Sequence, residues 1–119
     1  MQRNWDVVRK ILIKLEEIGN TSSFIHHNQV NGYDPEVVAY HMQLLDEAGL
    51  IKARCTFTGG GLTAAAQSMT WTGHEFLDQI RNDTVWNTVK NNAREKGISL
   101  SLDVIVQLAK AAISSLLKD

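Results

Sequence analysis

Hydrophobic residues recur at steps of three and four in the first part of the chain. Between residues 5 and 18 they form one apolar stripe, which consists of Trp5, Val8, Ile11, Leu12, Leu15 and Ile18. This period predicts an amphipathic helix. Asn4 can cap the start of this helix, and Gly19 can close its end.

A second helix is predicted after a polar, turn-rich region that spans residues 20–33. The alternating segment 24–30 within that region predicts a short strand. Asp34 and Pro35 then mark the helix start, because Asp is a preferred N-cap and Pro fits the first helical position. We expect Gly49 to supply the left-handed stop. The helix therefore spans residues 35–48, and its buried stripe holds Val37 or Val38, His41, Leu44, Leu45 and Ala48.

The hydrophobic period changes to two between Leu50 and Thr58, which predicts a half-buried strand. Its apolar positions are Ile51, Ala53, Cys55 and Phe57. Three glycines at 59–61 break this strand, and a return strand that ends near residues 69–71 completes a hairpin. The spacing of Thr72 and Glu75 is that of a capping box and predicts a further helix. The core side of that helix consists of Phe76, Leu77 and Ile80.

Two more helices are predicted at the end of the chain. Asp83 can cap the first and Gly97 can stop it; its inward positions are Val85, Trp86, Val89 and Ala93. The last helix runs from about Ser101 to Leu117, and 11 of the 16 residues from Leu102 onward are apolar. We expect residues 1–82 to form a core and residues 83–119 a C-terminal helical extension, packed on the core or used for oligomerisation.

Composition narrows the class of protein. The 119 residues are 44% hydrophobic and carry 12 Lys and Arg against 13 Asp and Glu. Such a chain can build one core, is too short for a two-lobed enzyme and is not disordered. The lone Cys55 excludes a disulfide within the chain. No secretory signal or membrane span is present in the sequence, so we expect a soluble cytoplasmic protein.

The order helix, short strand, helix, hairpin, helix resembles the winged-helix module of α+β type. In that module the helix before the hairpin is the recognition helix, and the hairpin is the wing. The usual module has an additional helix before the recognition helix, for which residues 20–33 leave little room. The expected fold is therefore a reduced winged-helix-like domain followed by C-terminal helices.

Several segments of the chain are distinctive, and they are WDVVRKIL at 5–12, Tyr40-His41, Leu44-Leu45, AGLI at 48–51, TWTGHEFL at 70–77, Ile80-Arg81 and Trp86. Through these segments the chain resembles a family of uncharacterised bacterial and prophage proteins, the domain of unknown function 2513. The resemblance covers most of residues 5–97. It implies a phage or prophage origin and a winged-helix-like core, and it implies no known activity.

Local charge separates two hypotheses for function. Helix 35–48 has no Lys or Arg, and with its cap Asp34 it has a charge of −4, whereas residues 52–74 contain no acidic residue. In a DNA-binding regulator, phosphates would be contacted by basic residues of the first helix and the hairpin. These are Arg3, Arg9, Lys10, Lys14, Lys52 and Arg54, with Tyr40 and Gln43 left to touch bases. The outward positions of helix 35–48 are Glu36, Ala39, Tyr40 and Gln43.

The second hypothesis is a protein-interaction module, for example a phage factor that engages a host or defence protein. Its acidic helix would then face a basic partner surface. The residues concerned are Glu36, Tyr40, Gln43, Asp46 and Glu47. The charge of the helix favours this hypothesis, and the fold resemblance favours DNA binding.

Catalysis, metal and cofactors have little support in the sequence. No histidine pair has zinc-ligand spacing, the glycines at 59–61 lack the Lys-Ser/Thr of a phosphate loop, and no nucleophile motif is present. We therefore expect a non-enzymatic protein without metal or cofactor. His41, His74 and Cys55 are interpreted as structural. The three tryptophans are interpreted as core residues, and they are Trp5, Trp71 and Trp86.

The last helix is apolar on more than one side, which favours an oligomer over a helix that only folds back onto its own domain. The predicted interface residues are Ile105, Leu108, Ala109, Ala112, Ile113 and Leu116.

Overall fold

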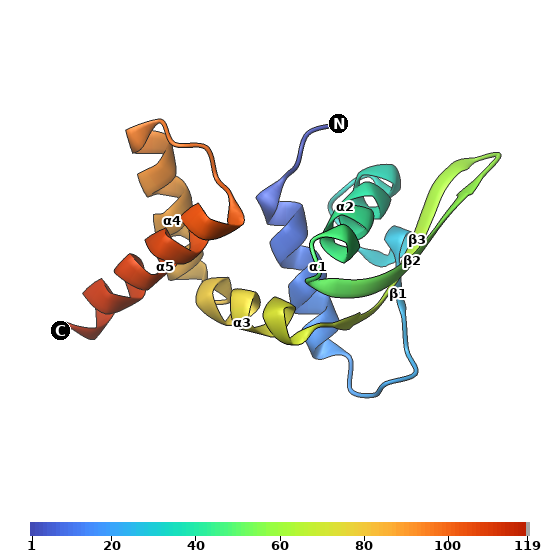
Figure 1. The fold of residues 1–119 in the computed structure, drawn as a ribbon, viewed down its shortest axis with the longest axis horizontal. Coiled ribbons are helices and arrows are strands. Elements are labelled where there is room, and N and C mark those ends of the chain that lie inside the picture. The colour runs from blue at the N-terminus through green and yellow to red at the C-terminus, as the bar shows by residue number, and fades with distance from the viewer. Residues whose placement is uncertain (119) are drawn as a thin grey trace. The chain divides into compact units, whose positions relative to one another are not determined.

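The computed structural model describes residues 1–118 and has an α+β fold (Figure 1). It forms two compact units, Met1–Glu75 and Phe76–Asp119. The first unit contains α1 (Trp5–Glu17), β1 (Ile25–His26), the 3₁₀ helix η1 (His27–Gln29), α2 (Pro35–Glu47), β2 (Ile51–Thr58) and β3 (Gly61–Met69). Helix α3 (Trp71–Ile80) spans the boundary, and the second unit contains α4 (Asp83–Lys96) and α5 (Leu102–Leu117).

Helix α1 begins as predicted. The Asn4 side chain accepts hydrogen bonds from the backbone N–H groups of Asp6 and Val7, at 2.9 and 3.4 Å. The helix ends differently, because Ile18 takes an extended conformation at the C-cap and Gly19 is not left-handed. The prediction that Gly19 closes the helix is therefore wrong.

Residues 24–30 form less strand than the alternation predicts. Only Ile25 and His26 pair with β3, and the chain then turns into η1. The turn begins where the Gln29 side chain accepts a hydrogen bond from the His26 backbone N–H at 2.8 Å. The short helix η1 lies within residues 20–33, where the sequence pattern predicts no helix.

Helix α2 confirms the predicted start and stop. Asp34 accepts from the backbone N–H of Glu36 at 2.9 Å, and Gly49 is left-handed with a φ of 77°. The buried face is shifted from the predicted one, because Ala39 is fully buried and Ala48 is exposed. The buried residues are Val38, Ala39, His41, Met42 and Leu45. Ala39 thus belongs to the core rather than to the outward face.

The three strands form an antiparallel sheet in the order β1-β3-β2. Helix α2 packs on one face of it, where Ile25, Ala64 and Ala66 are buried. The small alanine side chains allow the helix to lie close to the strands. In Figure 1 the far half of the hairpin extends beyond α2.

His41 connects α2 to the start of α1 and is fully buried. Its Nδ1 lies 2.8 Å from the carbonyl oxygen of Val37, and its Nε2 accepts a hydrogen bond from the Asn4 backbone N–H at 2.7 Å. Because Nε2 accepts, Nδ1 carries the proton and donates to Val37, so the ring is neutral. The predicted core histidine bonded to a backbone carbonyl is confirmed.

The start of α3 is held against the end of α2. The hydroxyl of Thr70 donates to the carbonyl of Gly49 at 2.6 Å and accepts from the backbone N–H of Gly73 at 3.0 Å. A Cβ atom on Gly73 would lie 2.0 Å from the Leu50 carbonyl oxygen, closer than any real contact. Thr70 is therefore the N-cap, and the predicted capping box of Thr72 and Glu75 is wrong.

In the second unit, α4 is capped one residue earlier than predicted, by the Asn82 side chain, which accepts from the Val85 N–H at 3.0 Å. Its four predicted inward residues, including Trp86, are buried, and Gly97 is left-handed as predicted. Helix α5 begins after Ser101, whose hydroxyl accepts from the Val104 N–H at 3.2 Å. Along α5 only Ile105, Ala109 and Ala112 are buried. No helix among residues 1–118 is long and apolar enough to cross a membrane.

Cys55 lies half-buried on the inner side of β2. Burial raises the pKa of its thiol above the ordinary value of 9.0, and the nearby carboxylates of Asp46 and Glu47 raise this pKa further. At neutral pH the thiol is therefore protonated, which makes it a poor nucleophile.

We predict that Gly73→Ala destabilises the protein, because its methyl group would overlap the Leu50 carbonyl and force the backbone apart. The free energy of unfolding, measured by urea denaturation, should fall by about 1–3 kcal/mol. Gly19→Ala is the matched control, since no atom lies within 4 Å of its Cβ position and Gly19 is not left-handed. Equal effects of the two substitutions would contradict the close packing at Gly73.

We predict that Cys55 reacts slowly with a disulfide reagent near neutral pH and faster as the pH rises, since only the thiolate reacts. The reaction rate of the folded protein should lie below that of the urea-unfolded chain. Asp46→Asn keeps an acceptor for the Ala53 N–H but removes a charge, so it should lower the pKa of Cys55 and speed the reaction. Glu36→Gln, at the other end of α2, is the control. The prediction fails if the two variants react at the same rate.

Candidate nucleic-acid interface

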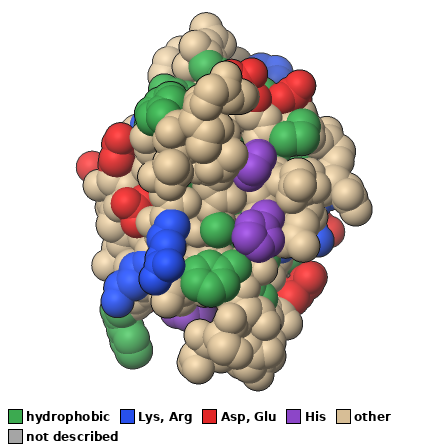
Figure 2. Space-filling model, turned by 90° about the vertical axis from the view of Figure 1, so that its right-hand side faces the viewer, with side chains coloured by type: hydrophobic (Ala, Val, Ile, Leu, Met, Phe, Trp, Pro, Cys, Tyr) green, Lys and Arg blue, Asp and Glu red, His purple; other side chains and the backbone are tan. Residues whose placement is uncertain are grey.

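The outer face of the sheet carries the basic residues of the hairpin. Lys52 and Arg54 are both exposed on β2. The strand register places Arg54 opposite Ala65 of β3, and Ala65 opposite His26 of β1. Arg54 and His26 therefore lie in one row across the sheet, on either side of a small residue. Figure 2 shows the side of the molecule that carries the hairpin, with basic, histidine and hydrophobic side chains next to one another.

An aromatic ring supports the arginine in this row. The Arg54 guanidinium carbon lies 5.9 Å from the centre of the Phe24 ring, within the range of a cation–π contact. Phe24 is 37% exposed, so part of its ring stays open to solvent. The contact restrains the arginine without neutralising its charge.

The hairpin tip has hydroxyl groups, glycines and one large apolar side chain. The Thr63 hydroxyl donates to the carbonyl of Thr56 at 3.1 Å, and the Thr58 hydroxyl donates to the carbonyl of Gly61 at 3.3 Å. Phe57 is 75% exposed, although its position on the apolar phase of β2 predicts a half-buried side chain. In Figure 1 the tip of the hairpin extends beyond α2.

The outward face of α2 is acidic. Glu36, Tyr40, Gln43 and Glu47 follow each other at steps of four, three and four, so they share one side of the helix. Both glutamates are exposed, whereas Tyr40 and Gln43 are half-buried. The Tyr40 ring stands edge-on to His41 at 5.8 Å between centroids.

The two aspartates of this region have structural roles. Asp34 caps α2, and Asp46 accepts a hydrogen bond from the Ala53 N–H at 3.0 Å, next to an irregularity in the strand pairing. The Asp46 side chain thus satisfies a backbone donor that the distorted strand cannot pair. Part of the −4 charge is explained by these backbone contacts.

The basic residues of α1 surround a different hollow, of about 310 Å³. It is lined by Asp6, Arg9, Lys10, Ile13, Lys14, Glu17 and Tyr33. Two acids share this hollow with three cations, so its net charge is small. Arg3 lies apart from it, with its guanidinium 4.6 Å from the centre of the Trp5 ring. The structure thus gathers Arg9, Lys10 and Lys14 in one place and Lys52 with Arg54 in another.

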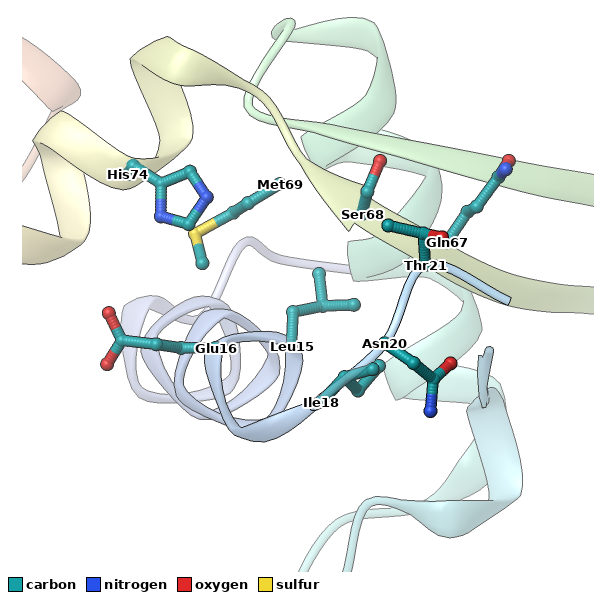
Figure 3. A pocket seen from close by; sticks show the side chains of 9 residues that line it. All are labelled: Leu15, Glu16, Ile18, Asn20, Thr21, Gln67, Ser68, Met69 and His74. Carbon is teal, nitrogen blue, oxygen red and sulfur yellow. The ribbon is translucent and has the colours of Figure 1, made fainter. Parts of the chain in front are cut away.

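Another hollow of about 330 Å³ lies between the end of α1, the end of β3 and the start of α3. Figure 3 shows the His74 ring beside the Met69 side chain, with Leu15 and Glu16 on the facing helix. His74 is exposed, and its backbone N–H donates to the Thr70 carbonyl at 3.0 Å.

Trp71 is 79% exposed, so its predicted place in the core is wrong. Its indole N–H donates to the carboxylate of Glu75 one turn later. The shift has a local cause: Thr70 rather than Thr72 begins the helix, and Gly73 rather than Trp71 faces Leu50. The sequence pattern does not predict that the rings of Trp71, Phe57 and Phe24 are exposed. The hydrophobic period shows which side of an element is apolar, but it does not show how far a neighbouring element covers that side.

The two histidines that are adjacent in sequence at the junction of β1 and η1 have different surroundings. His26 is exposed, whereas His27 is half-buried with its Nδ1 3.2 Å from the Ala64 carbonyl oxygen and 3.3 Å from the Ala64 nitrogen. His27 therefore continues the β1–β3 pairing with its side chain. Within residues 1–118, no three His, Cys, Asp or Glu side chains gather as metal ligands.

Comparison with known proteins identifies a family without an established activity. The chain matches the model of the family described as Hypothetical protein (DUF2513) over residues 2–99. An uncharacterized protein of Haemophilus influenzae is 44% identical over 117 residues, which cover 98% of this chain and 99% of that protein. No solved structure shows a significant match. Since the family model spans most of its length, the chain belongs to the DUF2513 family.

Proposed function

We propose that the protein is a non-enzymatic, winged-helix-type DNA-binding protein that contacts the duplex through its hairpin. The order α1, β1, η1, α2, β2, β3 and the strand order β1-β3-β2 support the winged-helix reading. In this reading η1 stands where the usual module has its additional helix, and the β2–β3 hairpin is the wing. The phage or prophage origin that the family resemblance implies stays a prediction.

The observation that carries the proposal is the acid-free, exposed hairpin with Lys52 and Arg54 on its outer face. Cations on such a surface displace counterions from the phosphate backbone, which is the main source of affinity in non-specific DNA binding. Glycines at the tip let the backbone approach phosphates closely. The exposed Phe57 offers an apolar group next to the charges.

The acidic face of α2 supports a contact in which the wing, rather than the recognition helix, approaches the duplex. Glu36 and Glu47 are exposed on that face and would be repelled by phosphates. Tyr40 and Gln43 are half-buried, which limits their reach toward base edges.

A second candidate is the protein-interaction module, and the same face favours it. A basic partner surface would be attracted by Glu36 and Glu47, with Tyr40 and Gln43 between them. The DNA-binding candidate depends on the hairpin, and the protein-interaction candidate depends on the outward face of α2. Variants of these two surfaces therefore separate the candidates.

Fluorescence anisotropy with labelled random-sequence duplex DNA, at low and at moderate salt, tests the proposal. We predict weak binding that declines steeply as salt rises, and a loss of about tenfold or more for Lys52→Ala/Arg54→Ala. If both residues contact phosphate, the salt slope should decrease by up to about two. Arg94→Ala/Lys96→Ala on α4 removes the same charge and serves as the control.

Glu36→Gln/Glu47→Gln should leave DNA affinity unchanged or raise it, because it removes like-charge repulsion. Absence of binding by the wild-type protein at low salt would refute the DNA proposal and leave the protein-interaction module. Equal losses of affinity in the hairpin and α4 variants would show that only net charge matters and that the hairpin is not the specific DNA contact.

A further inference from the structure

Helix α5 has a second apolar stripe beside the one that is buried. The buried stripe consists of Ile105, Ala109 and Ala112, and α5 packs against α4 within its unit. The second stripe consists of Leu102, Val106, Ile113 and Leu117, at steps of four, seven and four. At about 100° per residue these four side chains lie within an arc of about 60°.

Solvent reaches this second stripe. Leu117 is 80% exposed, and the other three residues are half-buried. The neighbouring Leu116, which continues the first stripe, is 53% exposed. Apolar side chains in such a row are usually covered by another surface.

The second stripe can pair with the same stripe of a second copy when the two helices run in opposite directions. When two copies of α5 lie antiparallel about a two-fold axis near residues 109 and 110, Leu102 of one copy meets Leu117 of the other. Val106 then meets Ile113, and the exposed Lys110 lies near the axis at the edge of the stripe. A two-fold contact requires this kind of self-complementary surface.

The charges at the two ends of α5 follow the same symmetry, whereas Lys110 of each copy lies near the axis. Asp103 is exposed at the start of α5 and Lys118 is exposed at its end. An antiparallel arrangement brings Asp103 of one copy toward Lys118 of the other, and it does so twice. Opposed helix dipoles add a smaller favourable term. A parallel pair would instead place like charges together.

We propose that a second copy of this chain covers the stripe, in an antiparallel α5–α5 dimer with Leu102, Val106, Ile113 and Leu117 as its apolar seam. The inference is independent of DNA binding. It also narrows the predicted oligomer interface, because Ile105, Ala109 and Ala112 are already buried in one copy.

Sedimentation velocity of the full chain over a wide concentration range tests this dimer. The wild-type protein should sediment as a dimer at high concentration. Leu117→Lys should raise the dissociation constant at least about tenfold. Ser114→Lys introduces the same charge on the polar side of α5 and is the matched control. Circular dichroism of each variant checks that helical content is retained.

A charge exchange tests the orientation. Asp103→Lys should weaken the dimer, and Asp103→Lys/Lys118→Asp should restore part of the loss. A wild-type monomer at all concentrations would overturn the proposal. Equal effects of Leu117→Lys and Ser114→Lys would overturn the seam, and failure of the double variant to recover would overturn the antiparallel arrangement.

Discussion

The first unit depends on the close approach of α3 to the end of α2. Gly73 leaves room for the Leu50 carbonyl where a Cβ atom would lie only 2.0 Å away, and Thr70 bonds to both Gly49 and Gly73. This junction joins the chain before β2 to the chain after β3. It therefore fixes the base of the hairpin. The AGLI and TWTGHEFL segments, which carry the family resemblance, meet at this point.

The hairpin and α2 present outward faces of opposite charge. The hairpin extends beyond α2 with Lys52 and Arg54 on its outer face, while α2 keeps Glu36 and Glu47 on its own outward face. His41 of α2 accepts a hydrogen bond from the Asn4 backbone N–H and so holds α2 against the start of α1, while its other ring nitrogen bonds to Val37 within α2. The near-zero net charge of the chain hides this separation. Our proposal for the hairpin depends on that local charge rather than on the total.

The sequence predicts most helices and strands of the structure, because caps, left-handed glycines and apolar periods are local signals. The Asp34 cap, the Gly97 stop and the buried Trp86 are examples. The sequence predictions fail where contacts between distant parts of the chain decide which side chains are buried. Trp71 is exposed because Gly73 takes the place against Leu50. Ala39 is buried because elements distant in sequence pack around α2, and the helical period alone does not show which of its faces they cover. Of the predicted basic residues, the structure gathers those of α1 and those of the hairpin into separate groups.

Recording which backbone amides respond to DNA tests directly whether the hairpin contacts the duplex. An ¹⁵N-labelled sample titrated with short random-sequence duplex at low salt gives a chemical shift change for each residue. Contact through the hairpin should give the largest changes between Lys52 and Thr63 and small changes along α2. Changes centred on residues 36–47, with an unaffected hairpin, would contradict it.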